Sequence, residues 1–107
     1  RVTAIPKSYV KEFTRTWLGL HIQQNSEQFA RAKRLLTAKG MVVMEVVPNS
    51  AGGRIGINPG DIIRQMNQKS VDTEEDYNKA VAEINNPDRI LLLVQRGRQG
   101  YYVTLEP

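Results

Sequence analysis

The sequence contains no cysteine and only one histidine, His21. The absence of cysteine excludes disulfide bonds and thiolate metal sites, but it fits a reducing cytosol and an oxidising envelope equally well. A Ser-His-Asp catalytic site would have to be built around the one imidazole. A lone histidine and scattered carboxylates also lack the spacing of metal ligands. We therefore expect no catalytic residues, no metal and no cofactor.

Long apolar runs are missing as well. No run approaches the roughly 20 residues needed to cross a bilayer, so we expect no direct insertion into a membrane. The chain begins at Arg1, and RVTAIPKSYVKEF lacks the apolar segment of a signal peptide, which indicates a piece of a longer protein. With 107 residues, 40% hydrophobic and 24% charged, the chain has the size and composition of one ordinary globular domain.

The net charge of +4 is unevenly distributed, with the basic excess in the first 39 residues. A basic region can indicate a nucleic-acid partner, and Arg31, Lys33 and Arg34 lie close together. These three fall on the polar side of a predicted amphipathic helix. Its apolar side would consist of Phe29, Ala32, Leu35 and Leu36. We therefore expect a solvated face and no nucleic-acid partner.

Two longer helices are predicted, over residues 25–40 and 73–84. Asn25 or Ser26 can cap the start of the first helix. Thr73 can cap the second, and the three acidic residues that follow it stand where the helix dipole favours negative charge.

Strands are predicted over 41–47, 61–67, 89–95 and 101–105, and TWLGLHIQQ (16–24) contains the start of a further strand. The glycine-rich segment 49–61 indicates tight turns around at most one helical turn, with Ser50 as its cap rather than as a nucleophile. Strands dominate this order. We expect an α+β domain, a partly open β-barrel or sandwich of five to six short strands capped by two helices.

Four short motifs, in this order, resemble a PDZ domain of the kind that follows the protease domain in HtrA-type, trypsin-like serine proteases. WLGL (17–20) is similar to the carboxylate-binding loop of that group. VVPNSAGGRIGINPGDIIRQMN (46–67) resembles its Pro-x-Ser turn, short helix and Gly-Asp-x-Ile strand, and DYNKAV and LLLVQRG fall where its groove helix and penultimate strand belong. VTAIPKSYVKEF resembles the end of the HtrA protease domain. We therefore expect a lead-in at 1–14 and a PDZ domain at 15–107.

The resemblance implies a module that captures C-terminal or extended apolar peptide tails by β-augmentation. The carboxylate-binding loop would consist of Trp17, Leu18, Gly19 and Leu20, with the amides of the last three around the carboxylate. The strand edge and the pocket would consist of His21, Ile22, Glu74, Asn78 and Val81. Gly19 is expected to leave room for the carboxylate and to allow the backbone angles of the loop.

The same resemblance implies partners and a location. The partners would be C-terminal or unfolded apolar peptide segments, together with the domain's own protease domain and sister subunits in a parent serine endopeptidase. The location would be the bacterial periplasm or cell envelope, and the role would be substrate recruitment or protease regulation in protein quality control.

Several alternatives remain open from the sequence. The domain could be a regulatory interface that packs on its own protease domain or sister subunits without binding free peptide. The LGLHI segment could be an ordinary core strand with a bulge at Gly19, and Trp17 could be a loop anchor or an exposed platform. Two departures from the family pattern also carry expectations. Gln68 stands where glycine is usual, which predicts a turn that is strained or of another type. The pair Gly52 and Gly53 should loosen the short helix.

Overall fold

The computed structural model describes the backbone of residues 7–106 and the side chains of residues 10–106. In chain order the elements are α1 (Lys7–Phe13), a π-helical turn η1 (Thr14–Leu18), β1 (Leu20–Gln24), α2 (Glu27–Lys33), β2 (Met41–Val46), α3 (Ala51–Arg54), β3 (Ile62–Met66), β4 (Lys69–Ser70), α4 (Glu74–Ala82), β5 (Ile90–Arg96) and β6 (Gln99–Leu105). Part of the predicted lead-in, residues 1–6, lies outside the described residues.

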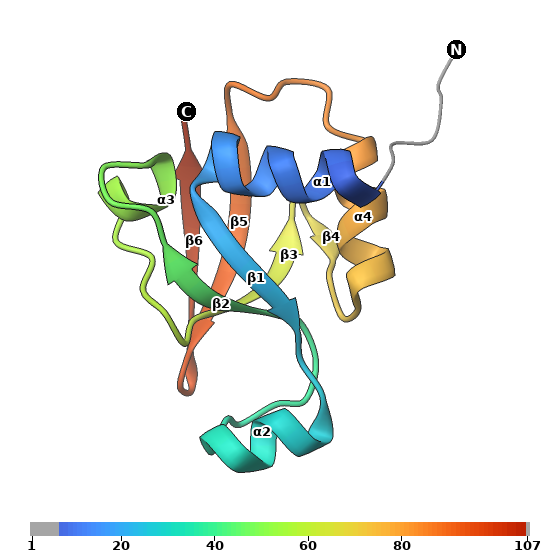
Figure 1. The fold of residues 1–107 in the computed structure, drawn as a ribbon, viewed down its shortest axis with the longest axis vertical. Coiled ribbons are helices and arrows are strands. Elements are labelled where there is room, and N and C mark those ends of the chain that lie inside the picture. The colour runs from blue at the N-terminus through green and yellow to red at the C-terminus, as the bar shows by residue number, and fades with distance from the viewer. Residues whose placement is uncertain (1–6, 107) are drawn as a thin grey trace.

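The six strands form one antiparallel sheet in the order β1-β2-β3-β5-β6, with β4 paired to β3. The sheet is open, because β1 and β6 each have a neighbour on one side only (Figure 1). This arrangement confirms the predicted α+β fold of five to six short strands. The two-residue strand β4 was not predicted.

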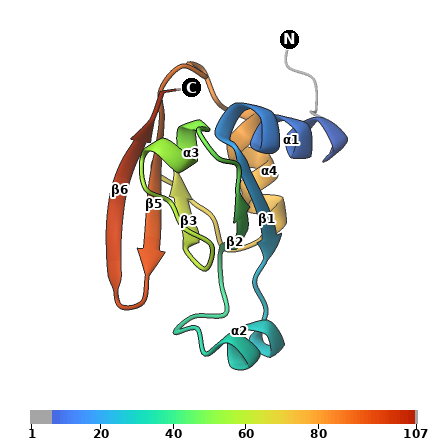
Figure 2. The same ribbon diagram turned by 60° about the vertical axis from the view of Figure 1, so that its left-hand side comes forward.

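The core lies between the sheet and α4, and its side chains follow the expected periods. Along β5, Ile90, Leu92 and Val94 are buried in alternation. Tyr77 and Ala80 are buried on the side of α4 that faces them. The cap of α4 was predicted correctly, since the Thr73 hydroxyl accepts a hydrogen bond from the Asp76 amide. Helix α1 packs on α4 and crosses the top of the molecule (Figures 1 and 2).

The helix predicted over 25–40 is shorter than expected. It ends at Lys33, because Arg34 adopts a left-handed conformation with φ of 58° and its N–H closes the last turn. Helix α2 lies in the connection from β1 to β2 and projects away from the sheet rather than capping it (Figure 2). The apolar side was also predicted wrongly, since Leu36 is 59% exposed. The residues that share the exposed surface are Arg31, Ala32, Lys33 and Arg34, while Ala30 is buried and Phe29 and Leu35 are half-buried.

The turn from β3 to β4 contains the departure expected at Gln68. Asn67 and Gln68 both have positive φ, 51° and 71°. This is the backbone pattern of a type I′ hairpin turn, in which glycine is favoured at the second position. Gln68 therefore carries the left-handed strain that the sequence predicted.

A buried carboxylate joins the segment after α3 to the sheet. Asp61 accepts a hydrogen bond from the Asn58 amide at 2.9 Å and from the Arg96 guanidinium at 2.8 and 2.7 Å. Arg96 also donates to the Gly56 carbonyl at 2.9 Å. The hydrogen bond with Asp61 raises the pKa of Arg96. Asp61 thus fixes the turn that leads directly into β3.

Candidate functional site

Strand β1 offers an open hydrogen-bonding edge. The Val47 amide donates to the Gly19 carbonyl at 2.8 Å, and the Asn25 amide donates to the Gly40 carbonyl at 3.0 Å, so backbone groups at both ends of β1 face β2. Backbone groups alternate in direction along an antiparallel strand. The residues that lie an odd number of positions from these two are Leu20, Ile22 and Gln24, and their N–H and C=O groups point to the open side.

The loop that begins β1 is packed against α3. Gly19 has φ of 77°, and a Cβ atom there would lie 2.0 Å from the Cβ of Ser50. From the sequence, Gly19 was expected to allow the backbone angles of the loop and to leave room for a carboxylate. The structure adds a further reason, because Ser50 leaves no space for a side chain at this position. Ser50 also caps α3, as predicted, since its Oγ accepts from the Gly53 amide at 3.1 Å.

Gly52 also allows α3 to approach the loop closely. A Cβ atom at Gly52 would lie 2.7 Å from Leu20 Cδ2 and 3.0 Å from the Leu18 carbonyl oxygen. From the sequence, this glycine was expected only to loosen the helix. In the folded chain α3 still forms (Ala51–Arg54), and Gly52 allows it to contact the loop.

The predicted amide cradle is partly occupied by the chain itself. The Gly19 amide donates to the Thr14 carbonyl, and Leu18 is the last residue of η1. Of the three predicted amides, that of Leu20 points to the open side. The lead-in helix therefore runs through a π-helical turn into the loop, with no linker between them.

Trp17 and Arg15 are both held by neighbouring side chains or backbone. The Trp17 indole N–H donates to the Pro87 carbonyl at 2.7 Å, and its ring stacks on Phe13 with 6.4 Å between centroids. The ring is 37% exposed, so Trp17 anchors the loop at the surface rather than in the core. Arg15 forms an ion pair with Glu12 at 3.0 Å.

The predicted groove residues fall into two hollows along β1. The upper hollow, of about 480 Å³, is lined by Leu20, His21 and Ile22 together with Lys11, Glu12, Thr14 and Arg15. The lower hollow, of about 390 Å³, is lined by Gln24, Glu74, Glu75 and Asn78. The Glu74 amide donates to Gln24 Oε1 at 2.6 Å and thereby links α4 to β1.

Val81 lies outside both hollows. It is 4% exposed and shares one buried cluster with Leu18, Leu20 and Val10. Helix periodicity placed it on the groove side of α4, but that prediction could not include the packing of α1 on α4.

The sequence analysis missed the contact that fixes α1. Thr14 is buried, and its hydroxyl donates to the Val10 carbonyl at 2.8 Å and forms a hydrogen bond with the Tyr77 hydroxyl of α4. Burial raises the pKa of Tyr77. The spacing of Val10, Phe13 and Thr14 was an available signal, because it places them on one face of a helix.

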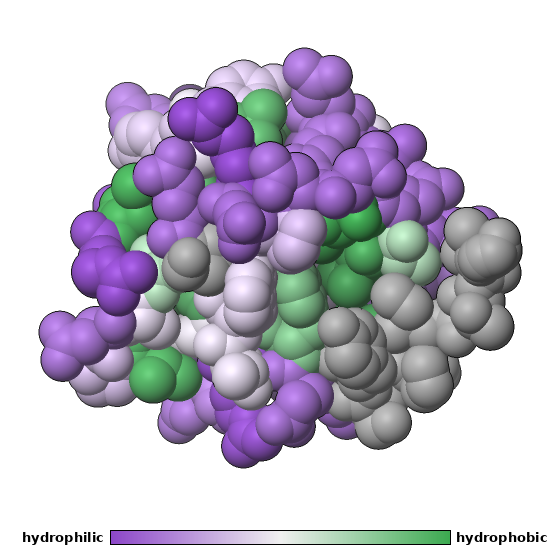
Figure 3. All heavy atoms as spheres, turned by 90° about the horizontal axis from the view of Figure 1, so that it is seen from above, coloured by the Kyte–Doolittle hydropathy of each residue, from purple (hydrophilic) through white to green (hydrophobic). Residues whose placement is uncertain are grey.

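The surface around this end of the molecule is mixed in character. Figure 3 shows hydrophobic side chains in several separate patches among hydrophilic ones. In the described part of the chain, no helix is long and apolar enough to cross a membrane. Nor do residues 7–106 bring together three His, Cys, Asp or Glu side chains around a metal position. The chemistry available along β1 is strand pairing and apolar contact.

Known proteins share this sequence pattern. A family model of the PDZ domain matches residues 8–95. A probable periplasmic serine endoprotease, DegP-like, of Chlamydia pneumoniae is 30% identical over 91 residues, which cover 84% of this chain and 18% of that protein. The periplasmic serine endoprotease DegP of Salmonella typhimurium is 27% identical over 113 residues, covering 96% and 24%. The chain thus spans about a fifth of the length of these curated relatives.

Solved structures share the fold. The crystal structure of the HtrA3 PDZ domain bound to a phage-derived ligand (FGRWV) is 27% identical with a TM-score of 0.70, and the match covers 84% of this chain and 82% of that one. The HtrA-type protease AlgW with a decapeptide is 26% identical with a TM-score of 0.72, covering 84% and 28%. These matches confirm the resemblance found in the sequence. Since the family model spans most of the chain, the molecule is a non-catalytic module and belongs to the PDZ domain family.

Proposed function

We propose that this domain captures C-terminal or extended apolar peptide tails, which add to β1 as a further strand. The observation that carries the proposal is the open edge, where backbone groups of Leu20, Ile22 and Gln24 point away from β2. Strand addition at such an edge derives affinity from main-chain hydrogen bonds and specificity from neighbouring side-chain pockets. The structures of the HtrA3 PDZ domain bound to FGRWV and of AlgW with a decapeptide support peptide capture as the function.

Each part of the site has a proposed role. The loop formed by Trp17, Leu18, Gly19 and Leu20 receives the terminal carboxylate. His21 and Ile22 form the strand edge, and the side chains contributed by α4 are Glu74, Asn78 and Val81. The peptide would run antiparallel to β1, so residues upstream of its terminus would reach the lower hollow.

For the parent protein, we propose an HtrA-like serine protease of the bacterial periplasm or envelope. The domain would recruit substrate to that protease or regulate it in protein quality control. The names of the relatives support this placement, since both are called periplasmic serine endoproteases. Residues 1–14 would then be the end of the protease domain, and residues 15–107 the PDZ domain.

A second candidate function is a regulatory interface with the parent's own protease domain or sister subunits. One observation favours it: at the start of the groove, the Gly19 amide is already bonded to the Thr14 carbonyl of this chain. In that case free peptides would not enter the site.

Titration with matched peptides separates the two candidates. A free-acid apolar peptide should bind with a dissociation constant on the order of 1 to 100 µM. Amidation of its C-terminus removes the charge and one acceptor, which should cost about 1.5 to 3 kcal/mol, or roughly tenfold or more in affinity. Backbone amide shifts at Leu20 and Ile22 would report binding. Equal binding of both peptides, or shifts confined to residues 29–36, would contradict the carboxylate-loop proposal.

A further inference from the structure

We infer that α1 and η1 form an intramolecular gate that holds the carboxylate end of the groove closed until a peptide displaces it. The inference rests on the proposed function. It adds a regulated closed state to that function, because a peptide terminus and the lead-in helix would compete for the same groups.

The first element of the gate is a backbone hydrogen bond. The Thr14 carbonyl oxygen accepts from the Gly19 amide, the central amide of the proposed carboxylate cradle. A carboxylate oxygen docked at this loop would require the same N–H. Since one amide cannot serve both acceptors fully, the i to i+5 bond of η1 must open before the cradle is complete. Isolated π-helical turns inside α-helices are rare and are often found at functional sites.

The second element is the apolar contact beneath α1. Val10 is 4% exposed and lies in the same buried cluster as Leu18, Leu20 and Val81. The last side chain of a bound peptide would need the space between these β1 and α4 residues. Because α1 packs on α4, Val10 would lie over the pocket that a terminal apolar side chain would fill.

The third element is a polar link across the groove. Thr14, which precedes β1, bonds through its hydroxyl to the Tyr77 hydroxyl of α4. Both side chains are buried, so the link fixes α1 above the gap between β1 and α4. The upper hollow remains beside it, and Lys11, Arg15 and Ile22 are among the residues that line it. A peptide could first pair with β1 there and then open the gate.

The inference is tested by measuring the affinity of the native chain and of gate variants for the pentapeptide FGRWV. Val10→Asp should detach α1, because a carboxylate is too costly to leave buried in an apolar cluster. If the open state is populated about 2 to 20% of the time in the native chain, the variant should bind five- to fiftyfold more tightly. Leu36→Asp introduces the same charge at an exposed position far from the gate and should bind as the native chain does.

Tyr77→Phe provides a second variant that retains the core ring and removes only the link to Thr14. It should bind FGRWV more tightly than the native chain, by about twofold or more. Unchanged amide shifts at Ile63 and Leu92 would show that each variant retains its core. In the native chain, saturating peptide should move the amides of Val10 to Thr14 to random-coil positions.

The outcomes are distinguishable. If the native chain, Val10→Asp and Tyr77→Phe bind FGRWV equally, the gate is overturned and peptide capture stands. Helical shifts at Val10 to Thr14 in the saturated complex would also overturn it. If neither the native chain nor any variant binds FGRWV or other peptides with apolar C-termini, the proposal of peptide capture is wrong, and the proposal of a gate is wrong as well.

Discussion

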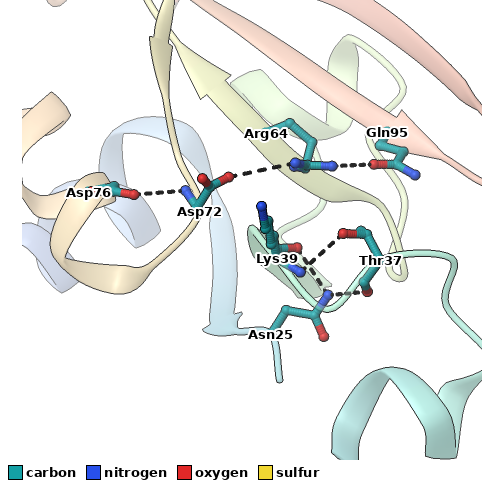
Figure 4. A network of polar contacts seen from close by, with 7 residues as sticks. All are labelled: Asn25, Thr37, Lys39, Arg64, Asp72, Asp76 and Gln95. Carbon is teal, nitrogen blue, oxygen red and sulfur yellow. Dashed lines mark hydrogen bonds and ion pairs between the residues drawn. The ribbon is translucent and has the colours of Figure 1, made fainter. Parts of the chain in front are cut away.

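The two ends of β1 are fixed in different ways. At its start, Gly19 and Gly52 bring backbone segments so close that a single added methyl group would overlap Ser50 or Leu20. At its far end, the buried Asn25 side chain donates to the carbonyls of Thr37 and Lys39, at 2.8 and 3.0 Å, and ties the returning chain to β1 (Figure 4). The first end depends on close packing. The second depends on one side-chain amide, while the exposed side chains around it can be replaced at little cost.

Gly19→Ala should have the largest effect, for two reasons. The backbone of residue 19 is left-handed, and the added Cβ atom would lie only 2.0 Å from the Cβ of Ser50. We expect a loss of about 3 kcal/mol or more in the free energy of unfolding, measured by urea denaturation. Gly97→Ala is the matched control, since Gly97 also has positive φ but nothing lies within 4 Å of its added Cβ. It should cost only about 1 kcal/mol. Equal losses would show that packing does not distinguish the start of β1.

Asn25→Ala should loosen the far end. It leaves the Thr37 and Lys39 carbonyls without their donor, which should cost about 2 kcal/mol. Hydrogen exchange should accelerate in residues 34–40 and stay unchanged at the start of β1. The control Leu36→Ala alters an exposed side chain of the same segment and should stay within about 0.5 kcal/mol of the native chain. Faster exchange throughout β1 would argue against two independent ends.

Gly52→Ala should show that close packing at the start of β1 outweighs helix propensity. Alanine favours a helix interior by about 1 kcal/mol, but its Cβ would lie 2.7 Å from Leu20 Cδ2. Overpacking typically costs about 1 to 3 kcal/mol, so we expect a net loss of about 1 kcal/mol in thermal or urea unfolding. The amide shifts of Leu18 and Leu20 should move as α3 is displaced. A more stable variant would contradict this balance.

Tyr77 should make the smallest difference at neutral pH and a growing one in alkali. Its pKa is raised by burial, whereas the phenol of the unfolded chain ionises near pH 10. Its contribution to stability is therefore complete below about pH 10 and is lost as pH rises above that value, by about 1.4 kcal/mol per unit. The free energy of unfolding of Tyr77→Phe should lack this component between pH 9 and 11. Tyr102→Phe removes an exposed phenol, and this variant should retain the pH-dependent component. Identical slopes of the free energy of unfolding against pH in the two variants would count against the prediction.

Local chemistry made much of the fold predictable. Ser50 and Thr73 were identified as helix caps because a hydroxyl at the first position satisfies an amide two or three residues later. The strands followed from runs of branched residues, whereas the special backbone angles of Gly19 were expected from the resemblance of WLGL to a carboxylate-binding loop. These features depend on neighbours within a few positions of the chain.

Long-range contacts account for what the sequence could not predict. Helix α2 ends early where Asn25 holds carbonyls 12 and 14 positions away. The Thr14 and Tyr77 hydroxyls form a hydrogen bond although they are 63 positions apart in the sequence, and no local sequence pattern predicts this pairing. In the candidate site, the strand edge was predicted at His21 and Ile22, whereas the backbone groups on the open side belong to Leu20, Ile22 and Gln24. The burial of Val81 was not predicted. The roles of the site residues remain proposals that the peptide titration tests.

The contact between Asp61 and Arg96 has a consequence for the response of the domain to ionic strength. Mobile ions screen a pair of exposed charges well, but they reach a carboxylate that is 3% exposed far less. The ion pair of Arg15 with Glu12 and that of Lys69 with Glu83 are more than half exposed on both sides. Added salt should therefore weaken those surface pairs and leave Arg96 bound to Asp61 and Gly56. The hydrogen bonds from Arg96 to Asp61 and Gly56 should therefore hold the segment after α3 in place at salt concentrations that already weaken the surface ion pairs.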